Sequence, residues 1–320
     1  MITKEQKKIF EEKIRAAESI VLMAHKNPDG DAICSVLALG RLIELNYHKH
    51  VDCVYDGNVP DNLDNVPLRK RYRFYERIEP DKPVDVAIVL DYGVARNIGG
   101  PYKFIEKAGF VIEIDHHIND DKIGHLCLDD DKAVATAEIV YCLMAECGWR
   151  RNIDIAQLLM TGLITDTGYF KYVKNGATMR IAGKLIDYGV DVQQIVNDLA
   201  NKPRKTVLTE AEAASQAEFL FNNRLAIATI NSRQYKNLDG RGETVLNLLG
   251  QIHGLDYIAL LKEQKENQIG VSLRGRYKCV DKIATALGGG GHEYAAGAVV
   301  YDTLDNVKKK VIDLIQKEIK

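Results

Sequence analysis

Short apolar runs alternate with helix-patterned segments along the first part of the chain. Residues 19–24, 84–90 and 110–114 are nearly continuous in apolar, largely β-branched side chains. Such runs are typical of strands buried on both faces of a sheet. Segment 32–46 repeats its apolar residues at helical spacing instead. Strand and helix alternating in this way predict an α/β fold with a doubly wound, mostly parallel sheet.

The pattern changes twice further along. Residues 133–200 are helical in pattern, and the Glu/Ala-rich stretch after them predicts a connecting helix. Beyond residue 222 short strands return, including a hairpin around 265–267. We therefore expect a catalytic domain over 1–200, a helical linker over 201–222 and a smaller, mixed α/β domain over 223–320.

One basic and aromatic stretch, 68–78, fits two interpretations. It is either a nucleic-acid surface or a solvated helix at the edge of the first domain. Periodicity alone does not separate the two.

Composition narrows the class of protein. The chain has 320 residues, of which 46% are hydrophobic and 28% charged, enough for two packed domains. A net charge of −2 excludes a strongly basic protein that binds long duplex nucleic acid non-specifically. We expect neither a signal peptide in segment 1–17 nor a membrane span, because the long apolar run that each requires is missing. The six cysteines form no CxxC pair, so free thiols and a cytoplasmic location are expected.

Charged side chains and imidazoles follow each of the three apolar runs. Parallel strands bring their carboxyl ends to one edge of the sheet, where α/β proteins bind ligands. A further carboxylate lies in Thr-Asp-Thr-Gly after a predicted core helix. The residues are His25, Asp29, Asp31, Asp91, Asp115, His116, His117 and Asp166.

Several of these residues have a structural explanation when taken alone. Pro28-Asp29-Gly30 is a turn signature, and Asp31 is a good N-cap for the next helix. Asp91 fits a loop or cap, and Asp166 fits a helix stop. The adjacent histidine pair has no such packing role, so the set as a whole favours a shared metal site.

Carboxylates and imidazoles without a thiolate indicate the type of metal. They favour Mg²⁺, Mn²⁺ or Fe²⁺ over cysteine-bound zinc. The ligands are too many for one ion, so we expect two ions ~3.5–4 Å apart. Such a pair lowers the pKa of a bridging water and stabilises in-line displacement at phosphorus. The predicted chemistry is hydrolysis of a phosphate ester or anhydride.

The C-terminal glycine run has a physical explanation of its own. Four consecutive glycines at 288–291 let backbone N–H groups approach an anion. Arg274, at the end of a predicted strand, offers a fork for phosphate, and Arg276 and Lys278 extend the basic surface. A flexible turn with a surface arginine is the plain alternative.

Together these motifs resemble those of the DHH phosphoesterases. The match comprises segment 25–32, the strand-ending Asp91, Asp115-His116-His117 and Asp166. The run 288–292 followed by Ala-Ala-Gly resembles the substrate-binding motif of the C-terminal domain associated with that family. The two-domain length is similar to the bifunctional oligoribonucleases and 3′-phosphoadenosine-5′-phosphate phosphatases (nanoRNases). The chain departs from that group at Tyr92-Gly93, where a small hydroxyl residue is expected, so the substrate wall there is expected to differ.

The resemblance implies a role for each residue. His25, Asp29 and Asp91 would hold a first Mn²⁺. A second would be held by Asp31, Asp91, His116 and Asp166, with Asp91 bridging. His117 would act on the scissile phosphate or the leaving group, and Asp115 would orient an imidazole. The substrate would contact Arg274, Gly289, Gly290, Gly291 and His292.

The implied protein is a Mn²⁺-dependent phosphohydrolase; Mg²⁺ and Fe²⁺ fit the same ligands. It would degrade short oligoribonucleotides to mononucleotides, remove phosphate from 3′-phosphoadenosine-5′-phosphate, or both. Linear or cyclic dinucleotides, pyrophosphate and polyphosphate are alternative substrates. A non-catalytic nucleotide-binding protein is a further alternative, against which the complete ligand set argues. No membrane or long duplex partner is expected, and a homodimer is compatible with the sequence.

Overall fold

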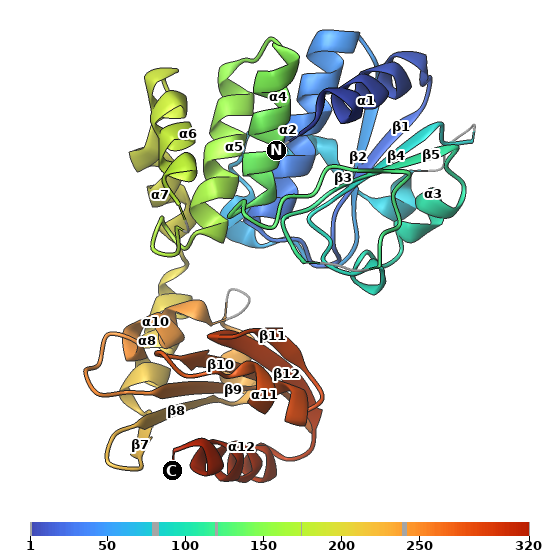
Figure 1. The fold of residues 1–320 in the computed structure, drawn as a ribbon. Helices are drawn as coiled ribbons and strands as arrows, with labels where there is room; N and C mark the ends of the chain where they lie inside the picture. Colours follow the sequence, from blue (N-terminus) through green and yellow to red (C-terminus); the bar gives the residue numbers. More distant parts are fainter. Residues whose placement is uncertain (1, 79–82, 119–120, 174, 239–241, 320) are drawn as a thin grey trace. The chain divides into compact units, whose positions relative to one another are not determined.

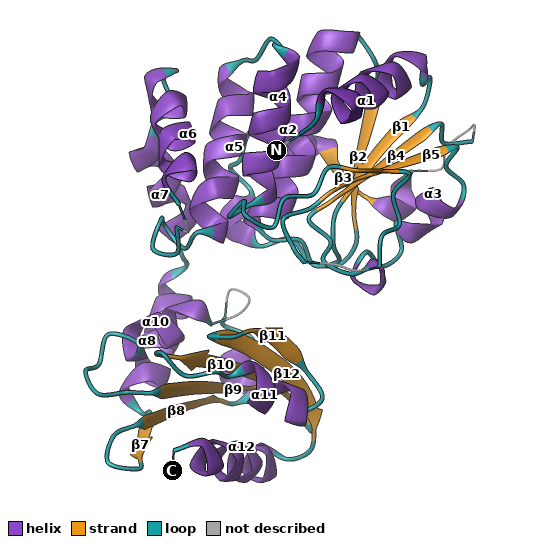
Figure 2. Cartoon of the chain, viewed as in Figure 1, coloured by secondary structure: helices purple, strands orange, loops and turns teal. Residues whose placement is uncertain are grey.

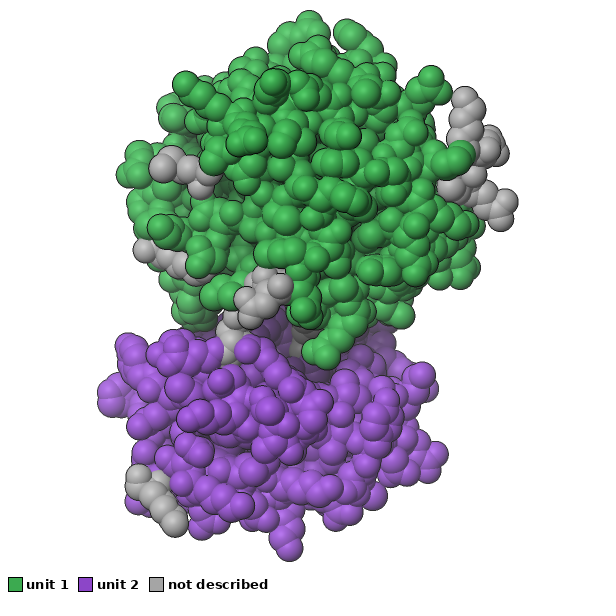
Figure 3. Space-filling model, turned by 45° about the vertical axis from the view of Figure 1, so that its right-hand side comes forward, with its two compact units in different colours: residues 1–201 green, residues 202–320 purple. Residues whose placement is uncertain are grey.

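The computed structural model describes every residue except 1, 79–82, 119–120, 174, 239–241 and 320. The chain divides into two compact units, Met1–Asn201 and Lys202–Lys320 (Figures 1 and 3). Each unit has its own six-stranded sheet with helices packed on it (Figure 2). The predicted fold class, a doubly wound parallel sheet followed by a mixed α/β domain, is confirmed.

The sheet of the first unit is parallel throughout, in the order β3-β2-β1-β4-β5-β6. Its strands are β1 (Ile20–Met23), β2 (Val51–Tyr55), β3 (Tyr72–Phe74), β4 (Val86–Leu90), β5 (Phe110–Ile114) and β6 (Leu126–Cys127). The order reverses between β1 and β4. Doubly wound sheets bind ligands at such a switch point, beyond the carboxyl ends of the strands.

Helices cover both faces of this sheet because alternate strand residues point to opposite sides. Leu22 and Ile88 belong to the larger core, whereas Val21 and Val89 pack with Phe104 on the other face. The second face carries α3 (Tyr102–Glu106). The larger core is built with α1 (Lys4–Ala16), α2 (Gly30–Tyr47), α4 (Thr136–Cys147), α5 (Ile153–Asp166), α6 (Gly176–Asp187) and α7 (Val192–Ala200). Short 3₁₀ turns lie at Asp61–Leu63, Arg69–Arg71, Tyr75–Arg77 and Ala95–Asn97.

Helix α2 starts immediately after the switch point. Asp29 is its N-cap, since its Oδ1 accepts the Ala32 N–H at 3.2 Å. Asp31, which the sequence suggested as N-cap, lies in the first helical turn and is buried. The helix can begin at Gly30 because this residue has no Cβ. A Cβ there would lie 2.4 Å from the side chain of Thr165. The missing side chain lets α2 begin in direct contact with the end of α5.

The basic stretch 68–78 forms the short strand β3 between two 3₁₀ turns, rather than the continuous solvated helix that was one of its two interpretations. Along β3, Tyr72 is buried, Arg73 is exposed and Phe74 is half-buried, which is the period of a strand. Arg71 forms an ion pair with Glu44, so part of the basic character is neutralised within the unit.

The second unit holds a mixed sheet in the order β11-β12-β10-β9-β8-β7, in which β8 and β9 are parallel and the other neighbours antiparallel. The hairpin predicted around 265–267 is present. The strands are β7 (Glu218–Leu220), β8 (Leu225–Ile230), β9 (Tyr257–Lys265), β10 (Gln268–Gly275), β11 (Gly290–His292) and β12 (Ala295–Tyr301). The helices are α8 (Arg204–Ser215), α9 (Ser232–Tyr235), α10 (Glu243–Leu249), α11 (Asp281–Ala286) and α12 (Leu304–Glu318). Helices α11 and α12 share a core with one face of the sheet, and α8 and α10 with the other.

Part of the predicted glycine loop is an edge strand, β11, that pairs with β12. A Cβ at Gly289 would lie 2.1 Å from the Gly297 carbonyl oxygen, and one at Gly291 would lie 2.6 Å from Ala296 Cα. These glycines therefore permit a close approach of two backbones. The glycines of β11 supply no alternation of apolar and polar side chains, which is why the pattern indicated a loop.

Among the described residues we find no helix with both the length and the apolar character that a membrane crossing requires.

Candidate active site

Every metal ligand predicted in the first unit lies at one edge of its sheet. His25 follows β1, Asp91 follows β4, His116 follows β5, and Asp166 ends α5. Three groups of side chains each bring one ligating atom per residue within 4.8 Å of the others. These groups are His25, Asp29 and Asp91; Asp31, His116 and Asp166; and Asp91, His116 and His117.

Asp91 belongs to two of these groups. One of its carboxylate oxygens lies 3.4 Å from His116 Nε2 and 3.5 Å from His117 Nδ1. Its φ of 50° lies in the left-handed region, which costs a residue other than glycine free energy. Such strain is typical of functional positions. The geometry matches a carboxylate shared between two neighbouring ions.

Asp31 is held by the N-terminus of α4. Its carboxylate accepts the backbone N–H groups of Thr136 at 2.6 Å and Ala137 at 3.0 Å, and the Ser35 hydroxyl at 3.0 Å. The first N–H groups of a helix have no partner within it and favour an anion. The Thr136 hydroxyl also donates to Asp91 at 3.2 Å. Sequence reasoning missed α4 as part of the site, because its partners lie about a hundred residues earlier.

Asp115 fixes the orientation of His117. One oxygen of Asp115 accepts the His117 backbone N–H at 3.0 Å and lies 2.8 Å from Nδ1 of its ring. The other accepts the N–H groups of Tyr92 at 3.1 Å and Gly93 at 2.8 Å. Burial raises the pKa of Asp115, but hydrogen bonds from His117 and Gly93 outweigh it and hold the pKa below its usual range. An ionised carboxylate only accepts, so a ring proton of His117 sits on Nδ1, facing Asp115.

The crowding of carboxylates and imidazoles shifts the pKa of several of these groups. Burial lowers the pKa of His116, but Asp91 and Asp166 outweigh it and raise that pKa to about 9. Burial and the neighbouring Asp91 raise the pKa of Asp166 to about 7. Burial and the Asp91 and Asp166 carboxylates raise the pKa of Asp31 well above its usual value. A bound cation would remove this repulsion.

The donor spacing fits a hard divalent ion. His116 Nε2 lies 3.4 Å from both Asp91 and Asp166, and His25 Nε2 lies 3.8 Å from Asp29. These separations exceed ordinary hydrogen bonds. They approach the ~3 Å between adjacent ligands of an ion with bonds of about 2.1 Å. Carboxylate and imidazole donors without a thiolate suit Mn²⁺ or Mg²⁺.

Tyr92, where the sequence departs from the nanoRNase pattern, is a core residue. It packs in the core covered by α3, and its hydroxyl donates to the buried Glu113 at 3.0 Å. Glu113 and Asp129 form a further acidic cluster with Cys127. The Lys122 ammonium lies 2.7 Å from Asp129 and 3.5 Å from Glu113, so a cation is already supplied there. The side chain of Tyr92 therefore lies in the core behind Asp91, and the altered substrate wall at Tyr92-Gly93 stays a prediction.

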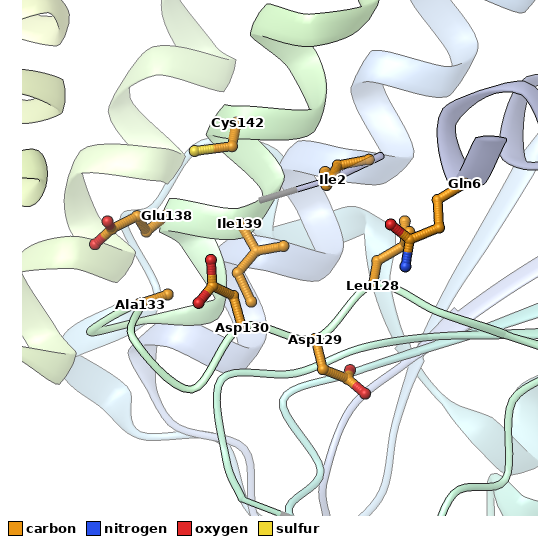
Figure 4. Close-up of a pocket in the computed structure, with 9 residues that line it drawn as sticks. All are labelled: Ile2, Gln6, Leu128, Asp129, Asp130, Ala133, Glu138, Ile139 and Cys142. Carbon is orange, nitrogen blue, oxygen red and sulfur yellow. The ribbon is translucent and has the colours of Figure 1, made fainter. Parts of the chain in front are cut away.

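A pocket beside α4 (Figure 4) includes none of the predicted metal ligands. Its lining residues are Ile2, Gln6, Leu128, Asp129, Asp130, Ala133, Glu138, Ile139 and Cys142. Glu138 within it already accepts the Thr178 hydroxyl at 2.8 Å. We assign no function to this pocket.

The predicted substrate residues of the second unit lie on neighbouring strands. Arg274 of β10 pairs with Ala295 of β12, and β12 pairs with β11. The guanidinium of Arg274 is held by Glu243, with Nη2 at 2.8 and 2.7 Å from the two carboxylate oxygens. A substrate phosphate would compete with Glu243 for Nη2 of this guanidinium. The side chain of His292 lies outside the described part of the structure.

Each of the two units matches a known family model. Residues 19–163 match the model of the DHH family, N-terminal domain, and residues 222–320 match that of the DHHA1 domain. The chain is 28% identical to the bifunctional oligoribonuclease and PAP phosphatase NrnA of Thermus thermophilus, over 98% of this chain and 95% of that protein. It is 25% identical to the protein of the same name from Bacillus subtilis, over 93% of this chain and 94% of that one.

A solved structure shares the whole fold. The crystal structure of an exopolyphosphatase-related protein from Bacteroides fragilis superposes with a TM-score of 0.93 at 24% identity. The alignment covers 100% of this chain and 98% of that one. At this identity the likeness establishes the fold.

Proposed function

Because this chain is a phosphoesterase of the DHH family, with a DHH domain followed by a DHHA1 domain, we propose that it hydrolyses short oligoribonucleotides or 3′-phosphoadenosine-5′-phosphate. The observation that carries the proposal is the convergence of carboxylates and imidazoles at the switch point of the parallel sheet. Relatives over nearly the whole length, from Thermus and Bacillus, bear the name of that bifunctional enzyme. We keep the cytoplasm as its proposed location.

The donor groups support two ions, with Mn²⁺ as the proposed metal. His25, Asp29 and Asp91 would hold one ion, and Asp31, His116, Asp166 and the shared Asp91 would hold the other. Two ions in such a site polarise a phosphoryl oxygen, lower the pKa of water and stabilise an in-line displacement.

The chain's own groups supply the remaining steps. His117, oriented by Asp115, would act through Nε2 on the scissile phosphate or the leaving group, donating a proton while its ring is protonated. In the second unit, Arg274 and the backbone of Gly289, Gly290 and Gly291 would bind the rest of the nucleotide, with His292 beside them. The net charge of −2 agrees with a substrate of a few phosphates.

Substrate assays with Mn²⁺ test the proposal. We expect turnover of di- to pentaribonucleotides to mononucleotides, or release of phosphate from 3′-phosphoadenosine-5′-phosphate. Pyrophosphate, polyphosphate and a cyclic dinucleotide serve as the alternatives. Preference for one of these three would refute the proposed substrate class while leaving the metal chemistry intact.

Asp91→Ala tests the shared carboxylate. The variant should lose at least about 10³-fold in kcat/KM, because both ions lose a ligand and with it several kcal/mol of transition-state stabilisation. Asp187→Ala, at an exposed carboxylate that ends α6, is the control and should retain full activity. Near wild-type turnover by Asp91→Ala would contradict the bridging role.

A further inference from the structure

A tight turn after β10 carries two cationic side chains and a tyrosine in series. Its residues are Arg276, Tyr277 and Lys278, immediately beyond Gly275, the last residue of β10. Gly275 makes the turn feasible, since a Cβ there would lie 1.8 Å from the Lys278 carbonyl oxygen. The sequence therefore specifies both the turn, through Gly275, and the three side chains that the turn carries.

The turn is fixed to the chain around it. The Gly275 N–H donates to the Tyr294 carbonyl at 3.0 Å, and the Val280 N–H donates to the Glu293 carbonyl at 2.7 Å. Residues 293–294 connect β11 to β12. The turn thus lies directly against the end of the glycine strand, beside the groups proposed to bind phosphate. Arg276 is tied down as well, because its guanidinium donates to the Gly250 carbonyl.

The side chain of Tyr277 is exposed to solvent rather than packed in a core. Its side chain is 90% exposed, and its φ of 62° lies in the left-handed region, which disfavours a bulky residue. Neither burial nor backbone preference accounts for an aromatic ring at this position. A rigid ring among cationic groups is the combination with which proteins bind single-stranded nucleic acid, since every base offers a face for stacking.

We propose that Tyr277 is a stacking platform for a nucleobase of the substrate, with Arg276 and Lys278 facing the adjoining phosphates. The backbone carbonyl of Tyr294, a residue whose side chain is half-exposed, accepts from Gly275 at the start of the turn. The platform rests on the proposed function, since it requires a substrate with bases. Pyrophosphate and polyphosphate have no base that could stack on the ring of Tyr277.

Substitutions in the full chain test the platform. Tyr277→Ala should raise KM for a dinucleotide about tenfold and leave kcat unchanged, whereas Tyr277→Phe keeps the ring and should match the wild type. The control is Tyr301→Ala, at a tyrosine that is 78% exposed in the same unit but next to Asp302 instead of lysine and arginine. That variant should also match the wild type.

Dinucleotide analogues that each lack one base complete the test. For the wild type, one of the two analogues should have a KM about tenfold higher than the intact dinucleotide. For Tyr277→Ala this difference should vanish, because ring and base act as one interacting pair. An unchanged KM in Tyr277→Ala, or an equal loss on intact and base-free substrates, would overturn the platform. A wild-type chain that hydrolyses neither di- to pentaribonucleotides nor 3′-phosphoadenosine-5′-phosphate would instead refute the proposed function.

Discussion

Thr136 touches both halves of the candidate metal centre. It is fully buried, its backbone N–H donates to Asp31, and its hydroxyl donates to Asp91. Groups that hydrogen-bond to metal ligands orient them, and their removal typically costs about 10- to 100-fold in metal affinity or activity.

Thr136→Val should therefore weaken Mn²⁺ binding at least about tenfold in calorimetric titration. The change keeps the shape and the backbone N–H but removes the hydroxyl, and Thr136→Ser should restore binding. Thr161→Val is the matched control, because Thr161 is 2% exposed and its hydroxyl donates only within α5, to the Gln157 carbonyl. Equal Mn²⁺ affinities in the two valine variants would show that the Thr136 hydroxyl orients nothing.

Protons and Mn²⁺ should compete for the same side chains. Burial lowers the pKa of His25 and His116, but neighbouring carboxylates raise each to about 9, from 6.5. The bound protons stabilise the metal-free fold fully below pH 6.5, and this contribution is lost as the pH rises through about 9. Mn²⁺ affinity should rise over the same interval. Titrations in buffers of different ionisation enthalpy should detect proton release, and its absence at neutral pH would contradict these protonation states.

At the scale of elements, the site depends on the close contact of α2, α4 and α5. Gly162 of α5 faces both other helices: a Cβ there would lie 2.7 Å from the Ala137 Cβ and 2.8 Å from Asp31 Oδ1. The absent side chain lets α5 approach the carboxylate that α4 holds. Core packing and ligand position are therefore coupled at this one residue.

Gly162→Ala should destabilise the first unit by about 1–3 kcal/mol through overpacking and should also weaken Mn²⁺ binding. Gly183→Ala on α6 is the control, because a Cβ there meets nothing within 4 Å. That change should stabilise by about 0.5–1 kcal/mol through helix propensity alone. Chemical denaturation of both variants measures the difference, and equal effects would exclude a steric role for Gly162.

At the scale of the whole molecule, the two units have separate cores, and the predicted metal ligands lie in the first. The chain has one tryptophan, Trp149, which is buried in the core of the first unit against Phe10. Its fluorescence therefore reports on that unit, whereas circular dichroism reports on both.

Mn²⁺ should raise the unfolding temperature reported by Trp149 and leave that of the second unit unchanged. A ligand at 100 times its Kd stabilises the state it binds by about 2.7 kcal/mol. Thermal unfolding with Mn²⁺ and with a chelator, followed by both signals, makes the comparison. A shift confined to the circular dichroism signal would place the metal in the other unit.

Local patterns were enough to predict the sheet, the hairpin and the residues that gather at the sheet edge. His25, Asp91 and His116 stand directly after buried strands, and parallel strands necessarily bring such positions together. The glycine strand β11 was missed because it has no alternating side chains.

Only the tertiary structure revealed the partners of those residues. Asp31 on the N-terminus of α4, Glu243 on Arg274 and the turn of Tyr277 beside Tyr294 join segments about 20 to 100 residues apart. The side-chain type of a metal-ligating residue and its position after a strand are both local features of the sequence, so the sequence determined which groups form the candidate site. The orientation of each side chain depends on hydrogen bonds from distant segments. No local periodicity encodes these bonds, so tertiary packing decided how the groups are held.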